Sequence, residues 1–289
     1  MRIRSFAAAT AAVLFLVVNH AQAAPKPELW ARWTAHDANS TQIIDHSAWS
    51  RLLGRYIKTD TSGVNRFDYQ AVDRDDRKVL DSYIDGLART EVSRLNRTEQ
   101  KAYWINLYNA LTIRTVLEHY PVESIKDIRI SPGFFSSGPW GAELVTVEGE
   151  KLTLDDIEHR ILRPIWQDPR IHYGVNCAAV GCPNLADTAY TSATVEAMLD
   201  EGAVAFINNP RGVRVRRGKL RVSSIYDWFE IDFGGDDAGV IAHIRMYAKP
   251  ELLARLDGIR RISGDSYDWM LNDVNNHAEF VMMDKKVEP

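Results

Sequence analysis

The chain has 289 residues, of which 45% are hydrophobic and 26% are charged, a composition typical of a folded globular protein. Its 39 acidic residues outnumber its 35 basic residues, which argues against a nucleic-acid-binding protein. Only two cysteines are present, Cys177 and Cys182, so the chain is not a disulfide-rich scaffold. A chain of this length can bury a substantial core without covalent support.

The first 23 residues have the features of a secretory signal peptide. Arg2 and Arg4 precede an apolar run of about 13 residues, and the run is followed by Ala21-Gln22-Ala23, which supplies small residues for cleavage. A membrane span needs roughly 20 apolar residues, and no later segment reaches that length. We therefore expect cleavage after Ala23 or Ala24, a periplasmic or secreted protein, and no membrane span.

The predicted organisation is a signal peptide followed by one folded domain. We assign residues 1–23 to the signal, 24–60 to an N-terminal helical extension, 61–275 to a single α+β domain and 276–289 to a C-terminal tail.

Hydrophobic periodicity and turn residues predict the elements in chain order. Helices are expected at 43–57, 78–95, 98–119, 154–163, 195–208, 225–233, 240–248 and 251–256. Strands are expected at 64–69, 170–176 and 260–262, with hairpins at 143–152 and 213–222. Thr153 is a candidate N-cap whose reciprocal partner is Asp156. Helices come first and mix with strands later, which predicts an α+β fold with a buried central helix on a small mixed or antiparallel sheet.

The helix at 98–119 is apolar on nearly every face, which is typical of a helix buried inside a domain. Asn106 and Asn109 are three positions apart in it and therefore lie on the same side. A buried amide must find hydrogen-bond partners, so these two either tie neighbouring loops to the helix or position a catalytic group.

The stretch 171–183 contains the residues with the clearest chemical potential. Cys177 follows His172, and a neighbouring imidazole can convert a thiol into a nucleophilic thiolate. Glu158 and Asn106 are candidates to orient that imidazole. In a regular strand His172 and Cys177 point to opposite faces, so the pair requires the strand to end or bulge near Gly174.

Two alternatives apply to the same stretch. In an oxidising compartment, Cys177 and Cys182 are close enough in sequence to form a small disulfide loop, which would remove the nucleophile. A metal could instead bind among His159, His172 and the two cysteines, although their spacing differs from that of structural zinc sites. No cofactor is expected from the sequence.

The hairpin at 213–222 is rich in basic residues. Arg214 and Arg216 alternate with Val213 and Val215, so one face of the hairpin is basic. The two interpretations are a solvated outer face and a contact with an anionic polymer such as an envelope glycan or lipid.

Several segments together resemble the domain of unknown function 547 family, and in particular its exported bacterial members. The matching segments are 102–110, 154–159, 172–177 with Cys182-Pro183, 224–229 with 232–233, and 267–269 with 271–272. The resemblance extends from about residue 64 to residue 272.

The resemblance implies a set of positions but no activity. The family pattern falls here on Trp104, Asn106, Asn109, Glu158, His172 and Cys177. Among the motif residues, Trp104, Tyr108 and Asn109 are candidates for ligand contact. At the level of the fold, the pattern is distantly similar to papain- or transglutaminase-like cysteine enzymes. In those enzymes the nucleophile lies on the helix, where this chain has Asn106.

Two functional hypotheses follow. The first is an exported cysteine-dependent hydrolase or acyl transferase in which Cys177 is the nucleophile, His172 the base and Glu158 the orienting group. Asn106 or Asn109 would hold the site or donate to an oxyanion. The second is a non-enzymatic envelope binding module with a structural disulfide between Cys177 and Cys182. Its ligand would be a small molecule, a peptide or an envelope polymer, and not a nucleic acid.

Overall fold

The long helix α3, Arg97–His119, runs through the larger of two hydrophobic cores. In this computed structural model, which describes residues 25–133 and 136–276, almost every α3 side chain between Glu99 and Leu117 is buried. Asn96 begins the helix by accepting a hydrogen bond of 2.9 Å from the backbone of Glu99. The prediction of a buried central helix is confirmed.

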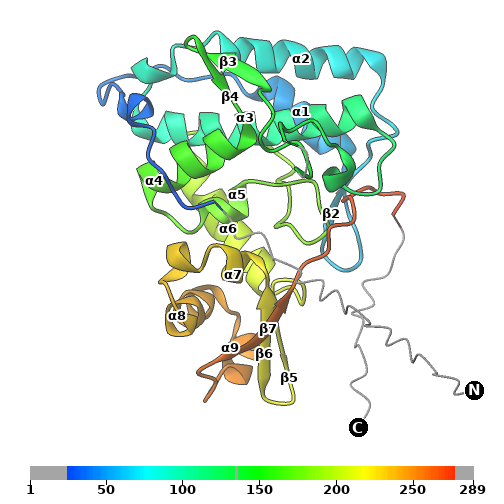
Figure 1. Cartoon of the computed structure of the whole chain (residues 1–289), viewed down its shortest axis with the longest axis vertical. Helices are drawn as coiled ribbons and strands as arrows, with labels where there is room; N and C mark the ends of the chain where they lie inside the picture. Colours follow the sequence, from blue (N-terminus) through cyan, green and yellow to red (C-terminus); the bar gives the residue numbers. More distant parts are fainter. Residues whose placement is uncertain (1–24, 134–135, 277–289) are drawn as a thin grey trace, which may run out of the picture.

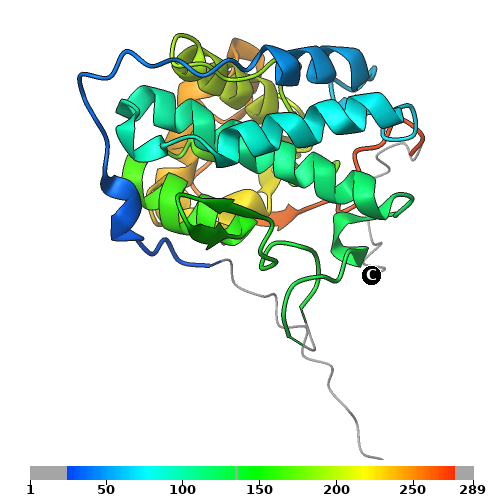
Figure 2. The same cartoon turned by 90° about the horizontal axis from the view of Figure 1, so that it is seen from above.

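Helices α1, α2 and α3 form a layer that covers one side of the molecule (Figures 1 and 2). Their bounds are Ser47–Tyr56 for α1 and Arg74–Ala88 for α2. The second of these begins four residues before its predicted start because Asp73 caps it, accepting from the backbone of Asp75 and Asp76 at 2.9 Å.

The remaining helical segments of the described chain are mostly short. The α-helices are α4 Arg163–Trp166, α5 Ile171–Gly174, α6 Val195–Ile207, α7 Ile225–Trp228, α8 Asp237–Tyr247 and α9 Pro250–Arg255. The others are the 3-10 turns η1 Ala31–Thr34, η2 Val92–Arg94, η3 Ile125–Asp127 and η5 Glu230–Phe233, and the π-helix η4 Asp156–Leu162. Of these, η4 and α4 occupy the predicted helix at 154–163, and α5 is one helical turn where a strand was predicted.

The strands form three small sheets. They are β1 Ile57–Thr59 with β2 Asn65–Phe67, β3 Val145–Val147 with β4 Glu150–Leu152, and β5 Val213–Arg216 with β6 Lys219–Ser223 and β7 Ile262–Ser266. Both predicted hairpins are confirmed, with the β3–β4 turn at Glu148-Gly149 and the β5–β6 turn at Arg217-Gly218, all at positive φ. Since β7 joins β6 in parallel, the third sheet is mixed.

The β5–β6–β7 sheet packs in a second hydrophobic core with α8 and part of α6, in the lower half of Figure 1. The α3 helix packs chiefly on α2, α6 and η4, whereas we expected it to pack on the sheet. The α5 turn joins the two cores because Ile171 belongs to the first and Tyr173 to the second. The fold is α+β, as predicted.

The described part of the N-terminal extension is integrated into the first core. Trp33 and Trp49 are buried there, and the backbones of Glu28 and Trp30 each donate a 3.0 Å hydrogen bond to η4 carbonyls. The predicted signal peptide lies outside the described residues, as does all but the first residue of the predicted tail. Within 25–133 and 136–276, no helix has the length and hydropathy to cross a membrane.

Candidate functional site

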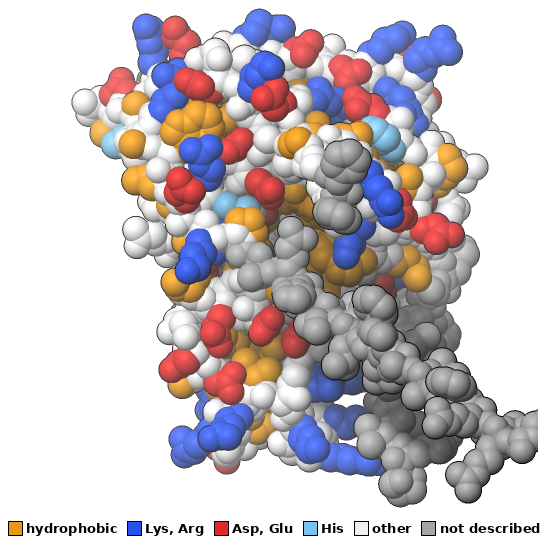
Figure 3. All heavy atoms as spheres, in the orientation of Figure 1, with side chains coloured by type: hydrophobic (Ala, Val, Ile, Leu, Met, Phe, Trp, Pro, Cys, Tyr) orange, Lys and Arg blue, Asp and Glu red, His pale blue; other side chains and the backbone are white. Residues whose placement is uncertain are grey.

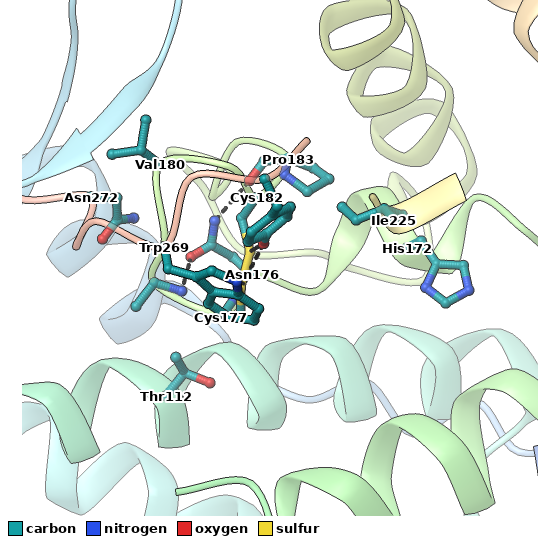
Figure 4. Close-up of a disulfide and its surroundings, with 12 residues drawn as sticks. Thr112, His172, Asn176, Cys177, Val180, Cys182, Pro183, Ile225, Trp269 and Asn272 are labelled. Atoms are coloured by element: carbon teal, nitrogen blue, oxygen red, sulfur yellow. Dashed lines mark hydrogen bonds between the residues drawn. A yellow bond between two sulfur atoms is a disulfide. The ribbon is translucent and has the colours of Figure 1, made fainter. Parts of the chain in front are cut away.

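Cys177 and Cys182 form a disulfide at the junction between the two cores (Figure 4). Asn176 shapes the loop that they close, because its side chain donates to the carbonyl of Pro183 at 2.7 Å and accepts from the backbone of Ala178 at 2.8 Å. The backbone N–H of Cys177 also points to the sulfur of Cys182, at 3.0 Å. Both cysteines of the chain are thus paired in this structure.

The expected pairing of His172 with Cys177 is not formed. Figure 4 shows the imidazole of His172 turned away from the two sulfur atoms. The strand predicted at 170–176 is wrong, because Ile171–Gly174 is a helical turn and the chain becomes extended only at Val175. The turn directs His172 toward η4 and η5, so the nucleophile and base of the first hypothesis are separated.

His172 is instead held between two carboxylates in the buried interior. Its Nε2 lies 2.7 Å from Oδ2 of Asp232, and its Nδ1 lies 3.6 Å from Oε1 of Glu158. The ring of Phe229 stacks on the imidazole at a centroid distance of 4.2 Å. Burial opposes the charged imidazolium, but the hydrogen bond to Asp232 and the nearby carboxylate of Glu158 outweigh it and raise the pKa of His172.

Arg163 completes this charged cluster. Its Nε donates to Oδ2 of Asp232 at 2.6 Å, and its guanidinium lies over the ring of Phe229. Burial by itself would raise the pKa of Asp232, but the hydrogen bonds from His172 and Arg163 lower it to about 2. Burial would likewise raise the pKa of Glu158, but the neighbouring imidazoles of His159 and His172 lower it to about 2. Arg163 and the imidazole of His172 thus lie against two carboxylates in a nearly dry environment.

This arrangement suits a structural role for His172 better than a role as a base. With a carboxylate near each ring nitrogen, the imidazole of His172 has no nitrogen directed at a thiol. The predicted contact of Glu158 with His172 is present. The second carboxylate that contacts His172 is Asp232, which the sequence reasoning did not identify. The metal alternative is not assembled either, because within the described residues no group of three or more suitable ligands converges.

The two asparagines of α3 tie loops to the helix. Asn106 donates to the carbonyl of Tyr190 at 2.7 Å and accepts from its backbone N–H at 3.0 Å. Asn109 donates to the carbonyl of Gly174 at 2.9 Å and accepts from the backbone of Asn176 at 2.8 Å. Both amides are engaged in these bonds, which corresponds to the loop-tying interpretation and places neither amide at an oxyanion position.

Trp104 and Tyr108 are interior residues. Each side chain is 1% exposed, and Trp104 packs edge-on against Trp33 at 5.1 Å. Burial, together with the charge of Glu158, raises the pKa of Tyr108 well above its ordinary value. Neither side chain is accessible to a ligand in this structure.

The structure brings four aromatic side chains together in one surface. Its members are Trp140, Trp228, Tyr267 and Trp269, all of which are partly exposed. Trp269 is central, with ring centroids 4.7 Å from Tyr267, 5.5 Å from Trp228 and 5.7 Å from Trp140. Two segments of the family resemblance, 224–229 and 267–269, supply three of the four rings and could have revealed the surface.

The disulfide loop supports this aromatic surface directly. The phenol oxygen of Tyr267 lies 3.0 Å from both sulfur atoms. The backbone of 178–181 pairs with that of 268–272, including a bond of 2.8 Å from Gly181 to the carbonyl of Asp268. Figure 4 shows Trp269 beside the disulfide. The position of two of the four rings therefore depends on the loop closed by Cys177 and Cys182.

Comparison with known proteins identifies a family but no activity. Residues 92–207 match the family model described as "Protein of unknown function, DUF547". The match includes Asn106, Asn109, Glu158, His172 and both cysteines. No curated protein and no solved structure matches the chain, so the distant likeness to papain- or transglutaminase-like enzymes stays a prediction.

Proposed function

We propose that this chain, a member of the family of unknown function DUF547 through residues 92–207, is a ligand-binding module of the cell envelope and not a cysteine-dependent enzyme. The observation that carries the proposal is the Cys177–Cys182 disulfide, which consumes both thiols and supports the partly exposed aromatic surface. A stable disulfide requires an oxidising compartment, in agreement with the predicted signal peptide.

The separation of His172 from Cys177 weighs against the hydrolase or acyl transferase hypothesis. Nucleophilic catalysis needs the base within hydrogen-bond reach of the thiol. Here the base is enclosed by Glu158 and Asp232 on one side of the junction, and the sulfurs face Tyr267 on the other.

The ligand class that fits the aromatic surface best is a neutral glycan chain. Flat aromatic rings offer large rigid contact area to the apolar faces of sugar rings. Asp155 adjoins Trp140, whose carbonyl accepts a 3.0 Å bond from the Asp155 backbone, and Asp227 adjoins Trp228 in sequence and is exposed. Burial, followed by the charge of Glu158, raises the pKa of Asp155 to about 6. Carboxyl groups beside the rings can bond hydroxyl and amide groups of a glycan and would repel a polyanion.

The first experiment determines the state of the cysteines. The protein is purified without reductant and alkylated before and after reduction, and its intact mass is measured. We expect no alkylation until reduction and two alkyl groups afterwards. Two thiols that react without reduction, with one unusually fast near neutral pH, would refute the proposal and favour the cysteine enzyme.

The second experiment tests the binding surface. Two neutral glycans, chitin oligosaccharides and cello-oligosaccharides, serve as probes, and binding is followed by calorimetry. We expect Trp228→Ala and Trp269→Ala to weaken binding about tenfold or more. Trp166→Ala is the matched control, since Trp166 is also partly exposed but lies on α4 away from the four rings. Unchanged binding by folded Trp228→Ala and Trp269→Ala proteins, or no binding of either probe by the unaltered protein, would overturn the glycan assignment.

A further inference from the structure

The β5–β6 hairpin concentrates positive charge at one end of a chain that is acidic as a whole. Strands β5 and β6 and their turn contain five basic residues and no acidic residue. Val213, Val215, Leu220 and Val222 point into the second core and are buried. The alternate positions, Arg214, Arg216, Lys219 and Arg221, therefore share the opposite face of the sheet.

The register of the hairpin places like charges directly opposite each other. Arg214 pairs with Arg221, and Arg216 pairs with Lys219. Such like-charge pairs destabilise an antiparallel ladder, whereas opposite charges at the same positions would stabilise it. Arg214 and Arg221 therefore repel each other across the ladder, and an external anion would relieve this repulsion.

Neighbouring elements extend the basic face. In the parallel β6–β7 pair Leu220 aligns with Ile262, which places Arg261 beside Lys219 on the same face. Arg260 is also exposed there, and Arg255 of α9 donates to the carbonyl of Val215. We call this set the basic end. Its members are Arg214, Arg216, Arg217, Lys219, Arg221, Arg255, Arg260 and Arg261. Figure 1 shows these elements at the lower end of the molecule, where Lys and Arg side chains gather in Figure 3.

Three charges of the basic end, those of Arg217, Lys219 and Arg221, differ from other surface charges in their pairing. In the layer formed by α1, α2 and α3, Arg55 pairs with Asp76 at 2.7 Å and Lys78 pairs with Asp75 at 2.9 Å. In the part of the chain that the structure describes, no carboxylate lies within 4.0 Å of the charged groups of Arg217, Lys219 or Arg221. Arg217 and Lys219 are thus available to an external anion, as is Arg221 apart from the bond of 3.1 Å that it donates to the carbonyl of Asp265.

We propose that the basic end is a docking surface for a bilayer of anionic phospholipids. Phosphates spread over a lipid surface complement basic side chains spread across β5, β6, their turn, the segment before β7 and the helix α9. Leu253 of α9 is 41% exposed and gives this end an apolar side chain that can enter the interface. The basic end has no aromatic residue on which nucleic-acid bases could stack, and this favours lipid over nucleic acid.

The test is co-sedimentation of the full chain with vesicles of phosphatidylglycerol and phosphatidylcholine in equal parts, and with phosphatidylcholine alone. Any contribution of residues 1–24 is common to all variants compared. We expect stronger binding to the anionic vesicles, weakened by salt. The triple variant Lys219→Glu/Arg221→Glu/Arg261→Glu should bind the anionic vesicles about tenfold more weakly or worse.

This triple variant is expected to fold, because the carboxylates introduced at positions 219 and 221 would face Arg216 and Arg214 as opposite charges. The matched control, Arg51→Glu/Lys58→Glu/Arg74→Glu, changes the net charge equally through exposed residues of α1, β1 and α2. Equal vesicle binding by both triple variants would overturn the proposal. So would binding of the unaltered protein to heparin or single-stranded DNA but not to anionic vesicles.

Glycan binding by the aromatic surface is measured separately on the same variants and should be unchanged. Failure of the lipid proposal is therefore distinguishable from failure of the glycan proposal.

Discussion

Nε2 of His172 lies 2.7 Å from Oδ2 of Asp232, across 60 positions of sequence, and this bond joins the α5 turn to η5. The same oxygen of Asp232 accepts from Arg163 on α4. Three elements that meet near the junction of the two cores are therefore held by one carboxylate.

Replacing this carboxylate tests its structural role. Asp232→Asn retains the shape but leaves buried Arg163 and His172 without their anion, which should lower the free energy of unfolding by about 3 kcal/mol. Chemical denaturation measures the change. Asp75→Asn, at an exposed position of α2, is the control and should change stability by less than about 0.5 kcal/mol. An equally small effect of Asp232→Asn would contradict the structural role.

The same variant should reveal the protonation of His172. Because the pKa of His172 is raised in the folded state, the charged pair stabilises the fold fully below the unfolded pKa of about 6.5 and loses its effect as the pH rises through the folded value. The stability difference between the unaltered protein and Asp232→Asn should therefore be largest in mildly acidic solution and should shrink in alkaline solution. A difference that grows with pH would show that His172 is neutral.

Reduction of the disulfide should weaken the fold moderately. The bond closes a loop with a sequence separation of 5, and a loop that short restricts the unfolded chain by about 2 kcal/mol. Denaturation with and without reductant measures this contribution. The Cys177→Ser/Cys182→Ser protein is the control, because its stability should not respond to reductant. Equal stability of the unaltered protein under both conditions would argue against a structural disulfide.

Asn109 should matter for the segment that precedes Cys177. Asn109→Ala removes two hydrogen bonds and leaves the Gly174 carbonyl and the Asn176 N–H unpaired in the interior, at a cost of about 2–4 kcal/mol. Hydrogen exchange should also become faster at 175–182. Exposed Asn39→Ala serves as the control and should be nearly neutral. Loss of stability without faster hydrogen exchange at 175–182 would show that Asn109 does not hold this segment.

Gly181 and Gly86 should respond to alanine in opposite directions. A Cβ at Gly181 would lie 2.8 Å from the backbone nitrogen and 2.9 Å from the carbonyl oxygen of Asp268, so Gly181→Ala must push the disulfide loop away from Tyr267 and Trp269. We expect a loss of about 2 kcal/mol and weaker glycan binding. Gly86 is exposed within α2 with nothing near its Cβ position, so Gly86→Ala should stabilise by up to about 1 kcal/mol. Thermal unfolding measures the stability of both variants. Unchanged stability of the Gly181→Ala protein would contradict the close approach of the two backbones.

Local features of the sequence were sufficient to predict many elements. The all-round apolar character of 98–119 predicted α3, and the turn residues Glu148-Gly149 and Arg217-Gly218 predicted the two hairpins. Thr153 and Asp156 form the predicted reciprocal cap, with bonds of 2.9 and 3.0 Å. These signals succeed because the interactions that produce them join residues only a few positions apart.

The site depended on contacts that the sequence does not display. By itself, the sequence determined that Cys177, His172, Glu158 and the α3 asparagines belong to one family pattern, and it left open whether they form a catalytic set or a structural one. The tertiary structure alone set the partners of these residues, since it turns His172 toward Asp232 and brings Tyr267 to the sulfurs from 85 to 90 positions away. The physical reason is that the direction of a side chain is set by the local backbone, here one helical turn in place of a strand, while its partner is set by how distant elements pack.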